Sequence, residues 1–283
     1  MTTILQDVLA SAARRLADAG IDTPLLDAQS IMASVLGCSR LDLIAHPNRE
    51  LTEPQSEEFL SMLNRREARF PLAYLIGKRE FHGLEIDVTP DVLVPRPETE
   101  TLIDVCVVSL WGGRTTVVDV GTGSGAIAIA LARNLPDARV YAIDNSAAAL
   151  KVARANVEKH QLSDRVTVLQ GDLLRPLRNA GVAFDAIVGN PPYVPTAEIE
   201  NLQPEIRLYE PRSALDGGAD GLDVYRRLLP DALPLLDEGG FVAVEVGLGQ
   251  ADAVRSIAVG CGYHTIETAR DLAGIERVVV VCK

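Results

Sequence analysis

The spacing of apolar residues divides the chain into two parts with different periods. In the first part, apolar side chains recur every three or four residues, the period of an amphipathic helix, beginning with Ile4, Val8, Ala12 and Leu16. Helix-start signals follow at Thr23, Ser39 and Thr52, the last of which opens a helix through about Arg69. These patterns predict a small helical bundle over residues 1–76.

Residues 79–94 follow a two-residue period instead. Apolar and polar side chains alternate along this stretch, and Gly83 stands where a tight turn is expected. The alternation predicts a β-hairpin, which forms a linker over residues 77–96. The prolines of P-R-P at 95–97 end the hairpin, and a helix is expected over about 98–110.

Strands and helices alternate from residue 115 onward. Short apolar runs typical of buried strands lie at 115–120, 138–143, 165–169, 184–188 and 240–246. Helical patterns separate most of these runs, which predicts a parallel sheet covered by helices on both faces. Two further strands, 262–268 and 276–282, are joined by a short connection, so the last strand is expected to run antiparallel. Residues 97–283 are therefore predicted to form an α/β domain with a Rossmann-like, mostly parallel sheet of seven strands.

The charge balance argues against one class of partner. Of the 283 residues, 47% are hydrophobic, which is typical of a globular protein, and the formal net charge is −12. A wide nucleic-acid-binding face needs clustered basic residues. We therefore expect no direct binding of nucleic acid.

Cysteine spacing and hydropathy favour a soluble protein with reduced thiols. The histidines are scattered and no C-x-x-C pair occurs, so no metal site is expected at Cys38, Cys106, Cys261 or Cys282. The N-terminus carries Asp7 and lacks the apolar core of a signal peptide. No stretch approaches the roughly 18 apolar residues of a membrane span. We expect a cytoplasmic protein without a membrane partner.

A glycine-rich loop follows the first strand of the predicted sheet. The sequence TTVVDVGTGSGAIAIALA places a strand before Gly121-x-Gly123-x-Gly125 and a helix after it. Glycines at such a turn let the backbone approach a ligand closely. The loop has no lysine and no G-K-[ST] sequence, so triphosphate binding is poorly supported. A nucleoside with a different tail fits better, and S-adenosyl-L-methionine is the obvious candidate.

Acidic residues follow the next two strands. Asp144 ends the second strand and is expected to accept hydrogen bonds from both ribose hydroxyls. Asp172 follows the third strand and is expected to accept from an adenine amino group, with Leu173 packing on the ring. Alternatively, Asp144 caps the helix expected at 146–160, and Asp172 is an ordinary turn residue. The carboxyl ends of successive parallel strands share one edge, which favours a joint binding site.

The sequence G-N-P-P-Y-V at 189–194 follows the fourth strand. Proline lacks an N–H and holds the preceding residue extended, so Asn190, Pro191 and Pro192 offer carbonyl acceptors but few donors. Tyr193 adds an aromatic ring. This combination suits a flat group that carries an NH2. The alternative is a proline-rich turn at the edge of the sheet.

Four segments resemble one enzyme family. They are PLAYLIGKREFHGLEIDVTPDVLVPRPETE at 71–100, DVGTGSGAIAIALA at 119–132, GNPPYV at 189–194 and YEPRSALDGGADGL at 209–222. The chain resembles the class I S-adenosylmethionine-dependent methyltransferases. More narrowly, it is similar to the protein-glutamine N5-methyltransferases that modify peptide chain release factors.

The resemblance implies a set of cofactor and substrate contacts. The cofactor would be S-adenosyl-L-methionine, with S-adenosyl-L-homocysteine as product, bound by Gly121, Thr122, Gly123, Ser124, Gly125, Asp144, Asp172, Leu173 and Asn190. The substrate would be the glutamine of the Gly-Gly-Gln loop of a bacterial release factor, held by Asn190, Pro191, Pro192 and Tyr193. The helical domain is expected to recognise the folded release factor.

The expected catalysis rests on positioning. The Asn190 side-chain oxygen and the Pro191 carbonyl would each accept one hydrogen of the glutamine NH2, and Tyr193 would pack on the amide face. Glu98 and Glu100 are expected to form a solvated first helical turn rather than to act directly.

Two other features near these segments carry weaker expectations. Pro95 and Pro97 are expected to shape the pocket wall. Residues 195–223 form either a lid or a surface excursion.

Three other functions remain open from the residues alone. An adenine-N6 methyltransferase acting on nucleic acid would also bind a planar NH2, but the acidic charge balance argues against it. Glutamine methylation of a ribosomal protein is a sister activity that the motifs barely exclude. A non-catalytic nucleoside-binding protein would have no need for Asn190 and the prolines after it.

Overall fold

The computed structural model describes residues 3–179 and 181–283, and the chain forms two compact units. One unit comprises the chain up to Lys78 together with Gln203–Tyr209, and the other comprises Arg79–Leu202 and Glu210–Lys283. The predicted division into domains at residues 76 and 96 stays a prediction. The assignment of 203–209 to the N-terminal unit was not foreseen.

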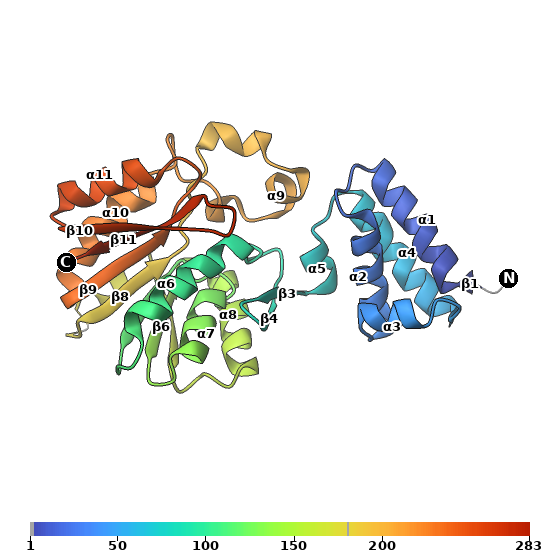
Figure 1. The fold of residues 1–283 in the computed structure, drawn as a ribbon, viewed down its shortest axis with the longest axis horizontal. Helices are drawn as coiled ribbons and strands as arrows, with labels where there is room; N and C mark the ends of the chain where they lie inside the picture. The colour runs from blue at the N-terminus through green and yellow to red at the C-terminus, as the bar shows by residue number, and fades with distance from the viewer. Residues whose placement is uncertain (1–2, 180) are drawn as a thin grey trace. The chain divides into compact units, whose positions relative to one another are not determined.

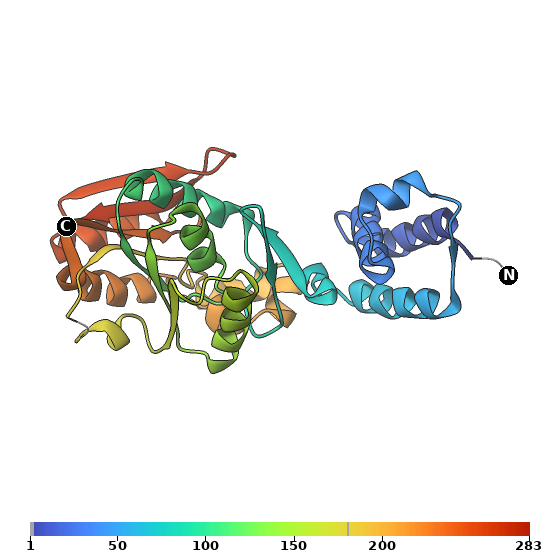
Figure 2. The same ribbon diagram turned by 90° about the horizontal axis from the view of Figure 1, so that it is seen from below.

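The N-terminal unit is the predicted helical bundle. Its elements are β1 (Thr3–Ile4), α1 (Leu5–Asp18), α2 (Pro24–Leu36), α3 (Arg40–Ala45), β2 (Glu50–Leu51), α4 (Glu53–Glu67), α5 (Leu72–Ile76) and α9 (Pro204–Tyr209). Helices α1, α2 and α4 pack on one another (Figure 2). They enclose buried apolar side chains such as Leu5, Leu16, Ile31 and Phe59. The antiparallel pair β1–β2 was not predicted.

Helix caps in this unit follow the sequence signals. Ser39 Oγ accepts from the Asp42 N–H at 3.2 Å, and the Thr52 N–H donates to Gln55 Oε1 at 3.0 Å. Helix α4 ends at Glu67, two residues before the expected end. The chain turns there because Arg69 adopts a left-handed conformation with φ of 67°.

The predicted β-hairpin is present and shorter than expected. Strands β3 (Lys78–Phe81) and β4 (Leu84–Asp87) pair through a turn in which His82 and Gly83 have φ of 49° and 73°. Positive φ at both central residues matches the twist of paired strands. Beyond Asp87 the chain is irregular although the alternation continues, because those residues have no partner strand.

The second unit contains the predicted seven-stranded sheet. Its strands are β5 (Thr116–Val120), β6 (Arg139–Asp144), β7 (Val166–Gln170), β8 (Phe184–Gly189), β9 (Leu236–Glu245), β10 (Thr265–Arg270) and β11 (Glu276–Cys282). Their order is β10-β11-β9-β8-β5-β6-β7. Strand β11 pairs antiparallel with both neighbours, and β9, β8, β5, β6 and β7 pair in parallel. The predicted fold class is confirmed.

Helices cover both faces of this sheet, as expected for parallel strands. Helices α6 (Glu100–Leu110), α7 (Ala126–Asn134) and α8 (Ala147–Lys159) lie on one face, and α10 (Asp223–Ala232) and α11 (Ala251–Cys261) lie on the other (Figure 1). A short 3-10 turn, η1 (Pro97–Thr99), leads into α6. The carboxyl ends of β5, β6, β7 and β8 therefore meet at one edge.

Candidate active site

The glycine loop over residues 121–125 has a backbone that few other residues could adopt. Gly121, Gly123 and Gly125 have φ of 72°, 54° and 84°. A Cβ atom at Gly121 or Gly123 would meet no atom within 4 Å, so glycine is required there for conformation and not for space. The N–H groups of Gly121 and Thr122 donate to the Ile143 carbonyl at 2.8 and 2.9 Å. The end of β6 thus holds the loop in place.

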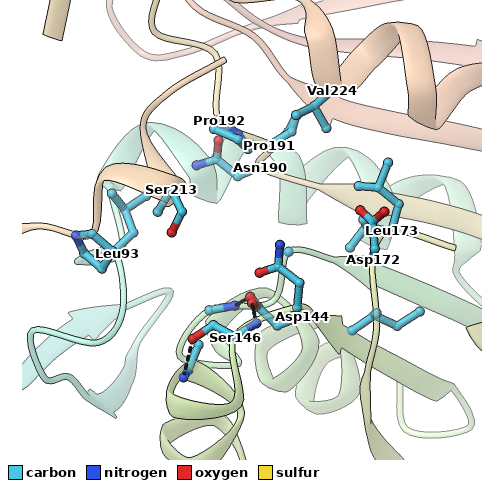
Figure 3. Close-up of a pocket in the computed structure, with 18 of the residues that line it drawn as sticks. Leu93, Asp144, Ser146, Asp172, Leu173, Asn190, Pro191, Pro192, Ser213 and Val224 are labelled. Carbon is cyan, nitrogen blue, oxygen red and sulfur yellow. Dashed lines mark hydrogen bonds between the residues drawn. The ribbon is translucent and has the colours of Figure 1, made fainter. Parts of the chain in front are cut away.

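Asp144 accepts hydrogen bonds from two backbone groups at the end of β6. The Gly123 N–H donates to Asp144 Oδ2 at 3.0 Å, and the Ser146 N–H donates to Asp144 Oδ1 at 2.9 Å (Figure 3). Ser146 is the residue that caps α8, because its Oγ accepts from the Ala149 N–H at 3.2 Å. Asp144 is therefore not the helix cap, and its expected contact with a ribose stays a prediction.

Asp172 and Leu173 lie beyond the end of β7. Arg227 of α10 donates to both Asp172 carboxylate oxygens, at 2.7 and 2.6 Å, an ion pair that the sequence did not indicate. Leu173 adopts a left-handed conformation with φ of 51°, which is uncommon for a residue with a branched apolar side chain. The expected contacts of both residues with an adenine ring stay predictions.

Asn190 follows β8, and its side-chain nitrogen is hydrogen-bonded to a neighbouring side chain. Its Nδ2 donates to Thr99 Oγ1 at 3.1 Å, and Thr99 Oγ1 donates to Glu245 Oε2 at 2.5 Å. Among the described residues no donor is bonded to Asn190 Oδ1. This oxygen is thus free to accept a hydrogen bond from a bound ligand.

Tyr193 is turned toward the same glutamate. Its hydroxyl donates to Glu245 Oε1 at 3.3 Å, and burial is the main cause that raises the pKa of Tyr193 above its usual range. The ring packs against the core of the second unit and does not line the cleft described below. The expected packing of Tyr193 on a substrate amide stays a prediction.

These segments surround one cleft of about 490 Å³, a volume that suits a small-molecule ligand. Asn190, Pro191 and Pro192 lie across the cleft from Asp144, with Asp172 and Leu173 at one side (Figure 3). The other predicted residues that line it are Gly121 and Gly123. Further lining residues that the sequence did not single out include Leu93, Ser213, Val224 and Arg227.

Other predicted loop residues support the cleft from behind. Thr122 and Ser124 are buried, at 5% and 2% exposure. Thr122 Oγ1 donates to Asp119 Oδ2 at 2.5 Å, and the Ser124 carbonyl accepts from Asn156 Nδ2 at 2.9 Å. A Cβ atom added at Gly125 would lie 3.4 Å from Ala153 of α8, so the loop and this helix are in close contact. In this structure they hold the loop rather than face the ligand space.

Asp119 is a buried acid that sequence reasoning missed. It is fully buried behind the glycine loop, and burial raises its pKa to about 7 despite bonds from Thr122 and the Ala128 N–H. Its Oδ1 has no hydrogen-bond partner among the described residues. The signal that could have found it is an acidic residue within an apolar strand directly before the glycines.

The P-R-P-E-T-E segment at 95–100 is hydrogen-bonded to other parts of the second unit. Arg96 donates to both oxygens of Glu210, at 2.7 and 2.8 Å, and Glu210 is buried at 7% exposure. Glu100 Oε1 accepts from the His82 N–H at 3.0 Å, so this residue connects the start of α6 to the hairpin rather than lying in solvent. The cleft wall nearby is formed by Asp91, Val92 and Leu93, and neither Pro95 nor Pro97 lines the cleft.

The sequence predicts neither a metal site nor a membrane span. Across residues 3–179 and 181–283, no group of three or more histidine, cysteine or acidic side chains is arranged to hold a metal ion. No helix in the same described ranges has the length and apolar character needed to cross a membrane.

The connection over 195–223 contributes Pro211, Ser213 and Asp216 to the cleft, and its role as a lid stays a prediction.

Known proteins match both units. The PrmC N-terminal domain matches residues 7–77, and the methyltransferase small domain matches residues 98–207. A release factor glutamine methyltransferase from Moorella thermoacetica is 46% identical, with 96% of each chain covered. One from Gloeobacter violaceus is 48% identical over 88% of this chain and 87% of its own.

A solved structure agrees on the fold. The crystal structure of a methyltransferase from Pyrococcus furiosus has a TM-score of 0.55 and 20% identity, covering 78% of this chain and 98% of its own. At that identity the likeness concerns the fold alone.

Proposed function

The chain belongs to the release factor glutamine methyltransferase family, and from this premise we propose that it transfers a methyl group from S-adenosyl-L-methionine to the side-chain amide nitrogen of a glutamine in a bacterial peptide chain release factor. The observation that carries the proposal is the shared cleft. Two sets of groups line this cleft. The glycine loop and the acidic residues suit a nucleoside, and the acceptor groups of Asn190 and Pro191 suit an NH2 group.

The residues present fit the proposed cofactor. The glycine loop leaves open space beside Gly121 and Gly123, and the carboxylates of Asp144 and Asp172 suit the hydroxyl and amino donors of an adenosine. Asp119 supplies an unpartnered buried oxygen behind the loop, where a nearby positive charge would stabilise its ionised form. S-adenosyl-L-methionine, when bound, supplies an electrophilic methyl group on a positively charged sulfur.

Asn190 and Pro191 would hold the substrate. A primary amide NH2 has two N–H donors, and the Asn190 Oδ1 and Pro191 carbonyl would accept one each. Both hydrogens of the substrate nitrogen are then fixed, and the direction of its lone pair faces the cleft. A well-oriented pair of reacting groups lowers the barrier by several kcal/mol, so orientation can compensate for the poor nucleophilicity of an amide.

We further propose that the helical unit recognises the folded release factor. No described residue of this unit lines the cleft, and binding energy from contacts other than those to the reacting group can be used to orient that group. The relatives' names support the release factor as partner.

The test is transfer of labelled methyl from S-adenosyl-L-methionine to purified candidates. We expect label in a bacterial release factor and none in a ribosomal protein or in DNA or RNA. A release factor in which the glutamine of Gly-Gly-Gln is replaced by asparagine is the matched control and should take up no label. Label in ribosomal protein or nucleic acid instead, or label that survives the glutamine replacement, would refute the proposal.

A further inference from the structure

The hydroxyl of Thr99 joins segments that are far apart in the sequence. Thr99 belongs to η1, Asn190 follows β8, and Glu245 ends β9. Thr99 and Glu245 are 4% and 1% exposed, so the bonds among the three side chains are shielded from water. Neither buried residue lines the cleft, whereas Asn190 does.

The direction of each hydrogen bond follows from the chemistry of Glu245. Both oxygens of Glu245 accept from hydroxyl groups, Oε2 from Thr99 at 2.5 Å and Oε1 from Tyr193 at 3.3 Å, which is the arrangement of an ionised carboxylate. In that form Glu245 only accepts, so the single proton of the Thr99 hydroxyl is committed to it. The hydroxyl can then only accept from Asn190, which must present its NH2 group, at 3.1 Å. The Asn190 oxygen is consequently left for the cleft.

If Thr99 did not donate to Glu245, the side-chain amide of Asn190 would have two equivalent orientations. A free hydroxyl could donate to Asn190 Oδ1 as readily as it accepts from Nδ2, because an amide rotated by half a turn occupies nearly the same volume. The rotated amide would present donors to the cleft and would repel the NH2 of a substrate. Glu245 therefore determines, through Thr99, which atom of Asn190 faces the ligand.

The charged groups around Glu245 act in opposite directions. The pKa of Glu245 is raised overall, mainly by burial and further by the nearby charge of Glu98, although bonds from Thr99 and Tyr193 and the positive charge of Arg277 on β11 act to lower it. Burying a carboxylate is costly unless its oxygens are hydrogen-bonded. Thr99 and Tyr193 supply those bonds, at 2.5 and 3.3 Å.

We propose that Thr99 and Glu245 are positioning residues for methyl transfer, which orient the Asn190 amide so that its oxygen receives the substrate NH2. The inference rests on the proposed function for its effect on rate. The orientation of Asn190 is a property of the protein alone and can be measured without substrate.

The kinetic experiment uses the full chain with release factor as substrate. Thr99→Val keeps the shape and removes the hydroxyl, and we expect kcat to fall by roughly 10- to 100-fold, the range that small misplacement of a reacting group produces. The affinity for S-adenosyl-L-methionine should stay within about twofold, because the glycine loop and Asp144 are unchanged. Thr99→Ser restores the hydroxyl and should recover most of kcat.

Glu245→Gln tests the other member of the pair. The amide that replaces the Glu245 carboxylate can donate to Thr99 Oγ1. The Thr99 hydroxyl would then donate to Asn190 Oδ1, which would no longer face the cleft, so we expect a loss of kcat similar to that of Thr99→Val. The double variant should lose little more than Thr99→Val alone, because both changes remove the same orientation. Thr265→Val, on the exposed surface of edge strand β10, is the matched control and should keep wild-type kinetics.

A second readout needs no substrate. The side-chain N–H signals of Asn190 can be assigned in a ¹⁵N nuclear magnetic resonance spectrum by their loss in Asn190→Asp. We expect slow exchange with water for the hydrogen bonded to Thr99 in the wild type and in Thr99→Ser, and fast exchange in Thr99→Val.

The outcomes separate the inference from the proposed function. A wild-type chain that methylates no release factor would refute the proposed function, and unchanged exchange of the Asn190 signals in Thr99→Val would refute the inference. Wild-type kcat in Thr99→Val would also refute it. A loss that Thr99→Ser fails to restore would overturn it in favour of a purely structural role.

Discussion

The backbone N–H of Gly123 donates to Asp144 Oδ2 at 3.0 Å, which ties the middle of the glycine loop to the end of the neighbouring strand β6. The carboxylate expected at a ribose therefore also supports the loop that would contact the rest of the cofactor. The second Asp144 oxygen accepts from the Ser146 N–H at 2.9 Å, so both oxygens already have a structural partner. Each oxygen keeps further acceptor capacity for a ligand.

This dual role leads to a prediction for two variants of Asp144. Asp144→Ala should weaken S-adenosyl-L-methionine binding by about 1.5–3 kcal/mol through the lost acceptor, and by more if the loop also loosens. Asp144→Asn keeps one acceptor oxygen and should lie between alanine and the wild type. Isothermal titration calorimetry measures both. Unchanged affinity in a folded Asp144→Ala protein would exclude this residue from the binding site.

A second prediction concerns Asp119 and pH. Its folded-state pKa is raised from 3.8 to about 7, so the folded protein binds more protons than the unfolded chain between those values. Stability attributable to this group is thus present at low pH and is lost as the pH rises from about 4 to 7. Asp119→Asn removes this contribution. The stability of the variant relative to the wild type should rise by about 4 kcal/mol across this window.

Urea unfolding at pH 4 and at pH 8, which enclose this window, provides the measurement. An asparagine oxygen can still accept from Thr122 and the Ala128 N–H, which both donate to Asp119 Oδ2, and its NH2 takes the position of the unpartnered Oδ1. Asp164→Asn on the exposed surface is the control and should show no such change. A difference between Asp119→Asn and wild type that does not vary with pH would contradict the prediction.

Local patterns were sufficient to predict the fold because each one agrees with the tertiary structure. The apolar runs that predict strands lie in a sheet buried on both faces, so tertiary packing reinforced the local signal. Hairpin length could not be predicted in the same way. The alternation beyond Asp87 continues without a partner strand, and pairing is a property of two segments rather than one.

The candidate site was predicted only where its residues belong to short motifs. Gly121, Asp144 and Asn190 stand at the carboxyl ends of strands that run in parallel, and topology brings such positions to one edge. Thr99 and Glu245 are 146 residues apart and carry no local signal, so only the folded structure brings them together. Asp172 stands at the expected place, but its ion pair with Arg227 depends on how α10 crosses the sheet.

A third prediction concerns the attachment of α9 to the helical unit. Glu205 accepts from Arg66 at 2.9 Å and from Arg69 at 2.7 Å, and Arg66 also binds the buried Asp27 at 2.7 Å. Glu205→Ala removes two charge-assisted bonds, which should destabilise the packing of residues 204–209 by about 1.5–3 kcal/mol.

Amide hydrogen exchange followed by mass spectrometry would locate the effect. Exchange should become faster in residues 204–209 while the central strands keep their protection. Glu58→Ala, an exposed change on α4, is the control and should leave that segment unchanged. Equal protection of 204–209 in Glu205→Ala and wild type would show that these ion pairs do not hold α9.

The fourth prediction concerns Asn190→Ala. Removal of the side-chain oxygen leaves the substrate nitrogen with one fewer fixed acceptor, so the rate of methyl transfer should fall by roughly 10²-fold or more. Cofactor affinity should change little, because residues 121–125 and Asp144 are untouched. Single-turnover kinetics on a release factor separates the two effects. Transfer at the wild-type rate would show that the G-N-P-P-Y-V segment is only a turn.

Asn190→Asp is the sharper variant, and the structure alters what it should do. Considered alone, an aspartate keeps an acceptor oxygen for the substrate and would be expected to retain more activity than alanine. The position of Asn190 Nδ2 is, however, 3.1 Å from Thr99 Oγ1, whose proton is committed to Glu245. A carboxylate there would compete with Glu245 for that single proton, and a half-buried and a buried negative charge would lie on either side of one hydroxyl.

The Asn190→Asp side chain should therefore either rotate away from Thr99, in which case its activity should fall to about that of the alanine variant, or bind a proton, in which case it keeps the geometry of Asn190. Protonation distinguishes the two responses. If the aspartate binds a proton, it can donate to Thr99 and restore the geometry, so activity should increase as the pH is lowered from 8 to 6, relative to wild type at each pH. Combining Asn190→Asp with Glu245→Gln removes the competing charge and should recover activity above either single variant. An Asn190→Asp protein as active as wild type at pH 8, with no gain from Glu245→Gln, would show that Thr99 does not discriminate between the two atoms of the Asn190 amide.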